Sequence, residues 1–118
     1  MIKKFTIISL IILSIAILFY RYNIYPYNWN KAEENFNKYI AQQGINKKNI
    51  KKVEKSKETT IGGIVFKVVY NDDPDLEYEY LYSNSYDDKP YNILLIIYDK
   101  QSSIDSNNIQ VKYPPLKK

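Results

Sequence analysis

The strongest hydrophobic pattern in the chain is a run of sixteen uncharged residues near the N-terminus, from Phe5 to Tyr20. A helix of that length is about 24 Å long, whereas the hydrocarbon core of a bilayer is about 30 Å thick. Residues 21–24 add two apolar positions, and the basic side chains on both flanks can extend to the membrane interface. We therefore expect the membrane to be the partner of Phe5–Tyr20. The predicted N-terminal organisation is a stub at residues 1–4, a transmembrane signal anchor at 5–24 and a juxtamembrane linker at 25–29.

Charges on either side of this run predict its orientation. Lys3 and Lys4 precede it, whereas only Arg21 follows it closely and the next basic residue is Lys31. Basic residues favour the cytoplasmic side of a membrane. We expect a single-pass cell-membrane protein with a cytoplasmic N-terminus and an external C-terminal domain.

Two other interpretations of the apolar run remain open. A cleaved signal peptide would share the basic start and the apolar centre, but the residues after Tyr20 are bulky and lack the small-x-small pattern of a cleavage site. Ser14-Ile15-Ala16 has that pattern, yet it lies within the apolar run. The third interpretation is a helix buried in a protein core.

The next periodic segment predicts an amphipathic helix over residues 31–43. Ala32, Phe36 and Ile40 recur every four positions and form one apolar stripe. Asn30 is a suitable N-cap, and Gly44 is well placed to end the helix in a left-handed conformation.

Alternating patterns then predict four strands and an α+β fold. The strands are expected at residues 50–57, 64–70, 76–82 and 91–98. Asn71–Asp75 has the composition of a turn, and Ile109 with Val111 could add a short edge strand. One helix followed by consecutive strands predicts a helix packed on an antiparallel meander of about four strands. The domain is expected at residues 30–112, with a tail at 113–118.

Composition excludes several kinds of chemistry. The net charge of +4 includes three basic residues around the apolar run, which leaves 14 lysines against 13 acidic residues in the remainder. The charges are interspersed, so nucleic-acid binding is not expected. The chain has no Cys and no His, and it has no glycine-rich phosphate loop. We expect no enzyme activity and no cofactor, because a general base, a thiol nucleophile and the commonest metal ligands are missing.

Two groups of carboxylates are the remaining candidates for chemistry. Asp72, Asp73 and Asp75 could supply oxygen ligands to calcium, but Pro74 favours a tight turn whose carboxylates cap backbone groups. Glu77 and Glu79 share one strand face about 7 Å apart, a spacing that any exposed strand produces.

A stripe of tyrosines is the only candidate partner surface. Tyr78, Tyr80 and Tyr82 alternate along the third predicted strand. They either form part of the core beneath the helix or present an aromatic surface to a partner. The pattern favours the core.

Several segments together resemble a known bacterial family. NIYPYNW after the anchor, KAEENFNKYIAQQGI as the single helix, KVVYNDDPDLEYEY and the closing VKYPPL are similar to the family catalogued as domain of unknown function 3139. The resemblance extends over nearly the whole chain and rests on architecture and turn residues. It implies a small membrane-anchored or exported protein, and it assigns no functional residue.

Two function classes follow from these expectations. The first is a non-catalytic binding or protein-interaction module at the outer membrane face. The second is a protective, immunity-type protein that intercepts a peptide or a hydrolase. Either could use an open sheet face or an edge strand to bind its target.

Overall fold

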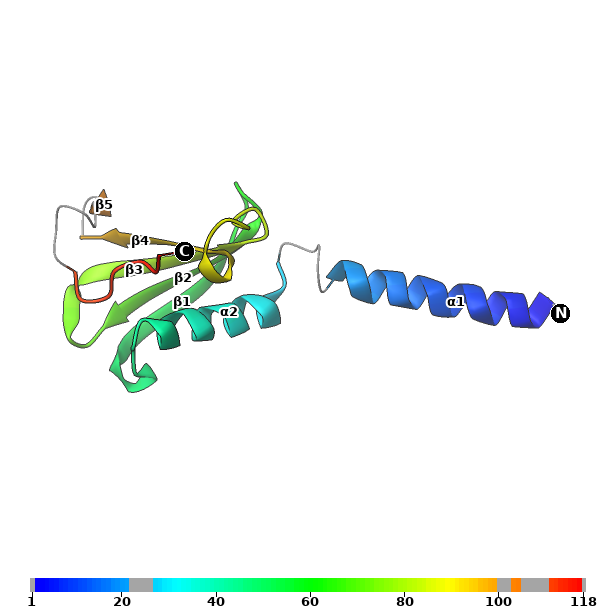
Figure 1. The fold of residues 1–118 in the computed structure, drawn as a ribbon, viewed down its shortest axis with the longest axis horizontal. Coiled ribbons are helices and arrows are strands. Elements are labelled where there is room, and N and C mark those ends of the chain that lie inside the picture. Colours follow the sequence, from blue (N-terminus) through cyan, green and yellow to red (C-terminus); the bar gives the residue numbers. More distant parts are fainter. Residues whose placement is uncertain (1, 22–26, 100–102, 105–110, 118) are drawn as a thin grey trace.

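The computed structural model of the protein describes residues 2–21, 27–99, 103–104 and 111–117 (Figure 1). Figure 1 shows helix α1 standing apart from an α+β domain that contains helix α2 and one antiparallel sheet. The strands follow one another across the sheet in the order β1-β2-β3-β4-β5. The elements are α1 (Ile2–Phe19), α2 (Trp29–Gln42), β1 (Ile50–Glu58), β2 (Gly63–Tyr70), β3 (Asp73–Ser83), β4 (Ile93–Tyr98) and β5 (Ser103–Ile104), with short 3₁₀ turns η2 (Lys47–Asn49) and η3 (Pro90–Asn92).

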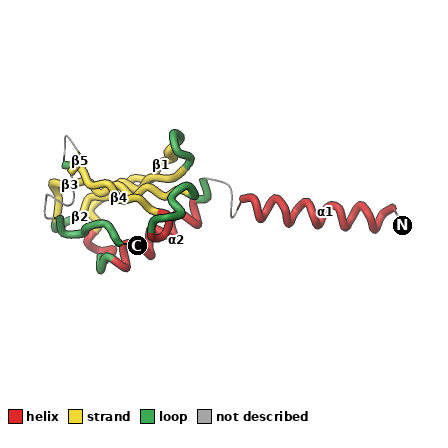
Figure 2. The backbone as a smooth tube through the Cα atoms, turned by 45° about the horizontal axis from the view of Figure 1, so that its top comes forward, coloured by secondary structure: helices red, strands yellow, loops and turns green. Residues whose placement is uncertain are grey.

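The predicted α+β class and the meander are confirmed. Alternate side chains of β2 point toward α2, and the cross-strand partners of those residues point the same way. Figure 2 shows that α2 covers one side of the sheet. The sheet residues that form the core beneath α2 are Ile64, Phe66, Val68, Tyr70, Tyr78, Tyr80, Tyr82, Ile93, Leu95 and Ile97.

Aromatic rings join the helix to the sheet. The Phe36 ring stacks on Phe66 with centroids 4.5 Å apart, and it meets the Tyr80 ring edge-on at 5.1 Å. Tyr39 meets Tyr80 in the same edge-on manner at 5.5 Å. The predicted apolar stripe of the helix is therefore the stripe that forms the core.

Both ends of α2 have side-chain or backbone caps. The N-cap is Asn28, two residues earlier than the predicted Asn30, because the Asn28 side chain accepts the backbone N–H of Lys31 at 3.1 Å. At the other end Gly44 has a φ of +78° and Ile45 donates to the carbonyl of Ile40. That pair of features is the predicted left-handed helix end.

Strand pairing shortens the predicted turn at residues 71–75. Tyr70 pairs with Asp73, so only Asn71 and Asp72 form the turn and Pro74 lies within β3. Proline is tolerated there because β4 pairs with β3 only from Glu77 onward, which leaves Pro74 beyond that ladder.

The fifth strand is not the one that the sequence predicts. Ser103 and Ile104 pair with the end of β4. Ile109 lies outside the described residues, and Val111 belongs to no strand but packs against the core. Apolar residues in a tail can therefore contribute to the core without joining the sheet.

Helix α1 confirms a helix in the apolar run, with different ends from those predicted. It begins at Ile2 and ends at Phe19, and Tyr22–Ile24 of the predicted span lie outside the described residues. Within the described parts of the chain, no helix has both the length and the apolar character that crossing a membrane requires.

Candidate functional site

The tyrosine stripe of β3 lies in the core. Tyr78 and Tyr80 are 0% exposed and Tyr82 is 1% exposed, because all three side chains lie on the sheet face that α2 covers. They cannot form a partner surface in this structure, since a partner could not touch them. In this structure the stripe is part of the core.

The hydroxyl groups of the buried tyrosines are all used in hydrogen bonds. The Tyr70 and Tyr80 oxygens lie 2.6 Å apart, and Tyr80 also donates to Oε1 of Gln43 at 3.0 Å. Tyr78 donates to Asp73 at 2.7 Å. Burial raises the pKa values of Tyr70, Tyr78 and Tyr80 far above the usual tyrosine range. These groups therefore stay neutral and serve as hydrogen-bonding parts of the core.

A C-terminal segment lies across one end of this tyrosine network. We call residues 111–117 the C-terminal strap. Nε2 of Gln43 donates to the carbonyl of Tyr113 at 3.1 Å and to the carbonyl of Pro114 at 3.0 Å. The Tyr39 hydroxyl accepts the backbone N–H of Leu116 at 2.9 Å. Two side chains, one at the C-cap of α2 and one within it, thus hold three residues of the strap by their main chain.

The aromatic side chain of the strap has its own binding place. The Tyr113 ring packs edge-on against Tyr70 with centroids 4.9 Å apart and lies 6.0 Å from Tyr78. Its hydroxyl donates to Asp72 at 2.5 Å and accepts from Nδ2 of Asn49 at 2.9 Å. The turn after β2 therefore recognises the ring and the hydroxyl of Tyr113 together.

The aspartates that were considered as calcium ligands have different hydrogen-bond partners. Asp72 accepts from Tyr113 and Asn49 and lies 3.7 Å from Nζ of Lys112. Asp73 accepts from Tyr78. In the part of the chain that the structure describes, no group of three or more metal-ligating residues could hold an ion. Asp72 and Asp73 thus act as hydrogen-bond acceptors in and beside the β2–β3 turn.

Titration of Tyr113 tests the link between the strap and the β2–β3 turn. Its hydrogen bond to Asp72 raises the pKa of Tyr113 to about 12, and the same bond lowers the pKa of Asp72. The folded pKa of Tyr113 exceeds its unfolded value of 10.0, so its stabilising contribution is complete below pH 10 and is lost as the pH rises through about 12. For Asp72 the folded pKa lies below the unfolded value of 3.8, so its contribution is lost in acid, as the pH falls below 3.8.

We expect Asp72→Asn to lower the pKa of Tyr113 toward 10.0, as followed by NMR of the tyrosine ring carbons. Asp75→Asn is the control and should leave Tyr113 unchanged, since the described side chains that shift the pKa of Tyr113 are those of Asp72, Asn49 and Asp73. An unchanged Tyr113 titration in Asp72→Asn would show that the strap is not anchored there.

An open hollow adjoins the far end of the strap. It has a volume of about 240 Å³ and lies between Tyr39, Pro90 and Leu116. Tyr91, beside it, has a φ of 56° and Asn92 has a φ of 57°, a left-handed conformation that is costly for a bulky side chain. Asparagine tolerates this conformation, so the strain lies at Tyr91, and strained backbone concentrates at functional sites. Nδ2 of Asn35 holds the Tyr91 carbonyl at 3.1 Å.

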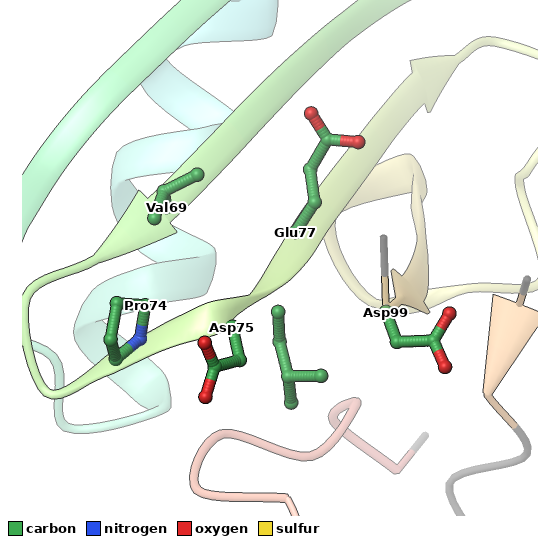
Figure 3. A pocket seen from close by; sticks show the side chains of 6 residues that line it. Val69, Pro74, Asp75, Glu77 and Asp99 are labelled. Atoms are coloured by element: carbon green, nitrogen blue, oxygen red, sulfur yellow. The ribbon is translucent and has the colours of Figure 1, made fainter. Parts of the chain in front are cut away.

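A second hollow lies near the β2–β3 turn and is acidic (Figure 3). Asp75, Glu77 and Asp99 line it together with Val69 and Leu76. In Figure 3 the three carboxylates are directed away from one another. They therefore line the hollow from different directions.

The Glu77–Glu79 pair belongs to the sheet face that α2 leaves open. Glu79 lies 3.8 Å from Nζ of Lys67, and its pKa is raised by partial burial. Cross-strand register places four apolar residues on the same face: Val65, Leu81, Leu94 and Ile96. The neighbouring Lys67 and the partial burial of Glu79 thus account for this carboxylate as part of the sheet surface.

Sequence reasoning missed the strap and the residues that hold it. Gln43 and Tyr113 are separated by 70 positions, and no local period connects them. The only available signal was Tyr113-Pro114-Pro115-Leu116, an extended motif with an aromatic start. Its place in the structure could not be deduced from that motif.

The fold is that of a small α+β domain whose single helix covers one sheet face and whose N-terminus carries an apolar helix. The model of a family described as "Protein of unknown function (DUF3139)" matches residues 1–80, and the chain belongs to this family. No curated protein and no solved structure matches the chain.

Proposed function

We propose that the protein is a non-catalytic binding module held at the outer face of a bacterial cell membrane by its N-terminal helix. The observation that carries this proposal is the surface of α1. Large apolar side chains cover all sides of this helix, and each of them is at least half exposed. The exposed fractions lie between 49% for Tyr20, just beyond the end of the helix, and 77% for Phe5. A surface of this kind exceeds what a protein normally presents to water. A bilayer is the solvent that it suits.

Polar groups in α1 are compatible with lipid. The Ser14 hydroxyl donates to the carbonyl of Leu10 at 2.9 Å, so the helix itself satisfies this side chain. Eighteen helical residues measure about 27 Å, a few ångströms less than a typical hydrocarbon core. Bilayer thinning and extension of flanking basic side chains accommodate such a difference. Lys3, Lys4 and Arg21 occupy those flanking positions.

The domain end nearest α1 also suits a membrane interface. Nδ2 of Asn28 donates to the carbonyl of Arg21 at 3.1 Å, which connects the start of α2 to the end of the apolar segment. Trp29, 39% exposed, follows directly, and Tyr27 lies beneath Nζ of Lys57 at 4.9 Å. Tryptophan, tyrosine and lysine favour the interfacial layer of a bilayer. The remainder of the domain is then displayed away from the lipid.

Removal of the apolar character of α1 tests the membrane attachment. We expect Ile11→Arg with Ile15→Arg to release the protein from membrane pellets washed with alkaline carbonate, since each arginine adds about 3 kcal/mol to the cost of insertion. Ile11→Leu with Ile15→Leu is the matched control and should stay in the pellet. Orientation is tested with Asp87→Cys, which introduces the only thiol of that variant and should react with an impermeant maleimide on intact cells.

Two results would contradict the proposal. Release of the unmodified protein by the carbonate wash would show that α1 does not insert. Labelling of the introduced thiol only after cell lysis would place the domain on the cytoplasmic side.

A further inference from the structure

We propose that the surface beneath the C-terminal strap is a peptide-binding groove for an extended partner segment with an aromatic residue, two prolines and an apolar residue. The inference rests on the proposed binding function and names its ligand class. Tyr39, Gln43, Asn49, Tyr70 and Asp72 form the groove. In this structure its own C-terminal strap occupies the groove as an intramolecular ligand.

The contacts of the groove with the strap are those of peptide recognition. Gln43 donates to two successive carbonyls, and Tyr39 accepts a backbone N–H two residues further on. These hydrogen bonds are made to main-chain groups, so they would form with any segment of the same conformation. Proline-rich segments are pre-organised in an extended helix, so they bind aromatic grooves at a small entropic cost.

Side-chain specificity comes from the two ends of the groove. At one end the ring of Tyr113 packs on Tyr70 while Asp72 and Asn49 bind its hydroxyl. At the other end Leu116 borders the open hollow formed with Pro90 and Tyr39. The first end selects a tyrosine, and the second end has room for a larger apolar side chain than leucine.

Val111, Tyr113 and Leu116 of the strap pack against the core, but the ring contacts that hold α2 on the sheet do not include them. The stacking of Phe36 on Phe66 and the edge-on contacts with Tyr80 involve no strap residue. Every strap residue is half-buried or exposed, with Lys112, Pro114 and Lys117 exposed. The groove walls therefore have a framework of their own, as a binding site for an exchangeable segment requires.

Tethering determines how the groove responds to a free peptide. A segment that belongs to the same chain as its binding site has an effective concentration that can reach the millimolar range. If the peptide binds with a Kd of about 100 μM, a tethered competitor at about 1 mM weakens its apparent affinity about tenfold. Release of the strap should therefore raise the apparent affinity for the free peptide by about tenfold.

The experiment uses the full chain in detergent micelles and a labelled synthetic peptide with the sequence of Val111–Lys117. We expect Tyr113→Ala to bind the peptide at least about tenfold more tightly than the unmodified protein. Adding Gln43→Ala should remove that binding, whereas adding Lys38→Ala, on an exposed part of the same helix, should not. A peptide with alanine in place of its tyrosine should not bind.

Leu116→Asp is a second variant that releases the other end of the strap, and it should show the same gain in affinity. Equal peptide affinity in all variants, or no binding at millimolar peptide, would overturn the proposal. Loss of folding in both variants would also overturn it, because the strap would then be part of the core. A dimer of the unmodified protein that Tyr113→Ala abolishes would assign the groove to a second copy of the chain instead. None of these outcomes depends on membrane attachment, so the groove and the anchor are tested independently.

Discussion

Replacing Phe36 with alanine should lower the free energy of unfolding by about 3–5 kcal/mol, the usual cost of truncating a buried phenylalanine. Phe36 is only 5% exposed and lies at the centre of the contact between α2 and the sheet. Its ring stacks on Phe66 and touches Tyr80 edge-on, so truncation removes both ring contacts and leaves a cavity. For a domain of this size the loss corresponds to a fall of at least about 12 °C in Tm.

Thermal unfolding of the full chain in detergent, followed by tyrosine circular dichroism, measures this effect. Lys38→Ala is the control on the same helix, since its side chain is exposed and pairs with Glu34 at 3.0 Å on the helix surface. That change should alter stability by no more than about 0.5 kcal/mol. A loss below about 1 kcal/mol for Phe36→Ala would contradict the packing of α2 on the sheet.

Gly63→Ala should have the second largest effect, a loss of about 3 kcal/mol, at the upper end of typical overpacking costs. A Cβ atom at Gly63 would lie less than 3.0 Å from the carbonyl oxygen of Tyr82, closer than real Cβ atoms come. That oxygen belongs to the backbone of the neighbouring strand, so no side-chain rotation can relieve the collision. One of the two strands must move, and the pairing of Gly63 with Ser83 must change.

Gly44 provides the comparison for that prediction. It has a φ of +78°, but a Cβ atom there would have nothing within 4 Å. Asparagine tolerates the left-handed conformation, so Gly44→Asn should cost well under 1 kcal/mol, whereas Gly63→Asn should be as damaging as Gly63→Ala. Equal losses at the two glycines would show that the close approach of β2 and β3 does not limit residue 63.

Local periodicity explains the parts of the fold that could be predicted. Ala32, Phe36 and Ile40 recur at the helical period, and their spacing alone places them on one face. The β2 segment alternates with a period of two, and all of its residues that point toward α2 are buried. These predictions succeed because side-chain direction follows directly from backbone geometry.

Element ends were predicted less well, because they depend on competing contacts. Asn28 and Asn30 are both good N-cap residues, and the start of α2 was decided by the hydrogen bond that Asn28 forms with Lys31. The start of β3 was decided by the pairing of Asp73 with Tyr70, which overrides the turn preference of Asp-Pro-Asp. Neither contact can be read from propensity.

The sequence by itself determined the apolar helix, the amphipathic helix, the order of the first four strands and the family of this protein. Tertiary structure alone decided which face of β3 is buried, since a tyrosine stripe suits both a core and a surface. It also decided where the candidate groove lies, since Leu116 donates its backbone N–H to Tyr39, which is 77 positions away in the chain. Such contacts depend on how the helix, the β2–β3 turn and the strap come together, and hydrophobic periodicity describes only one element at a time.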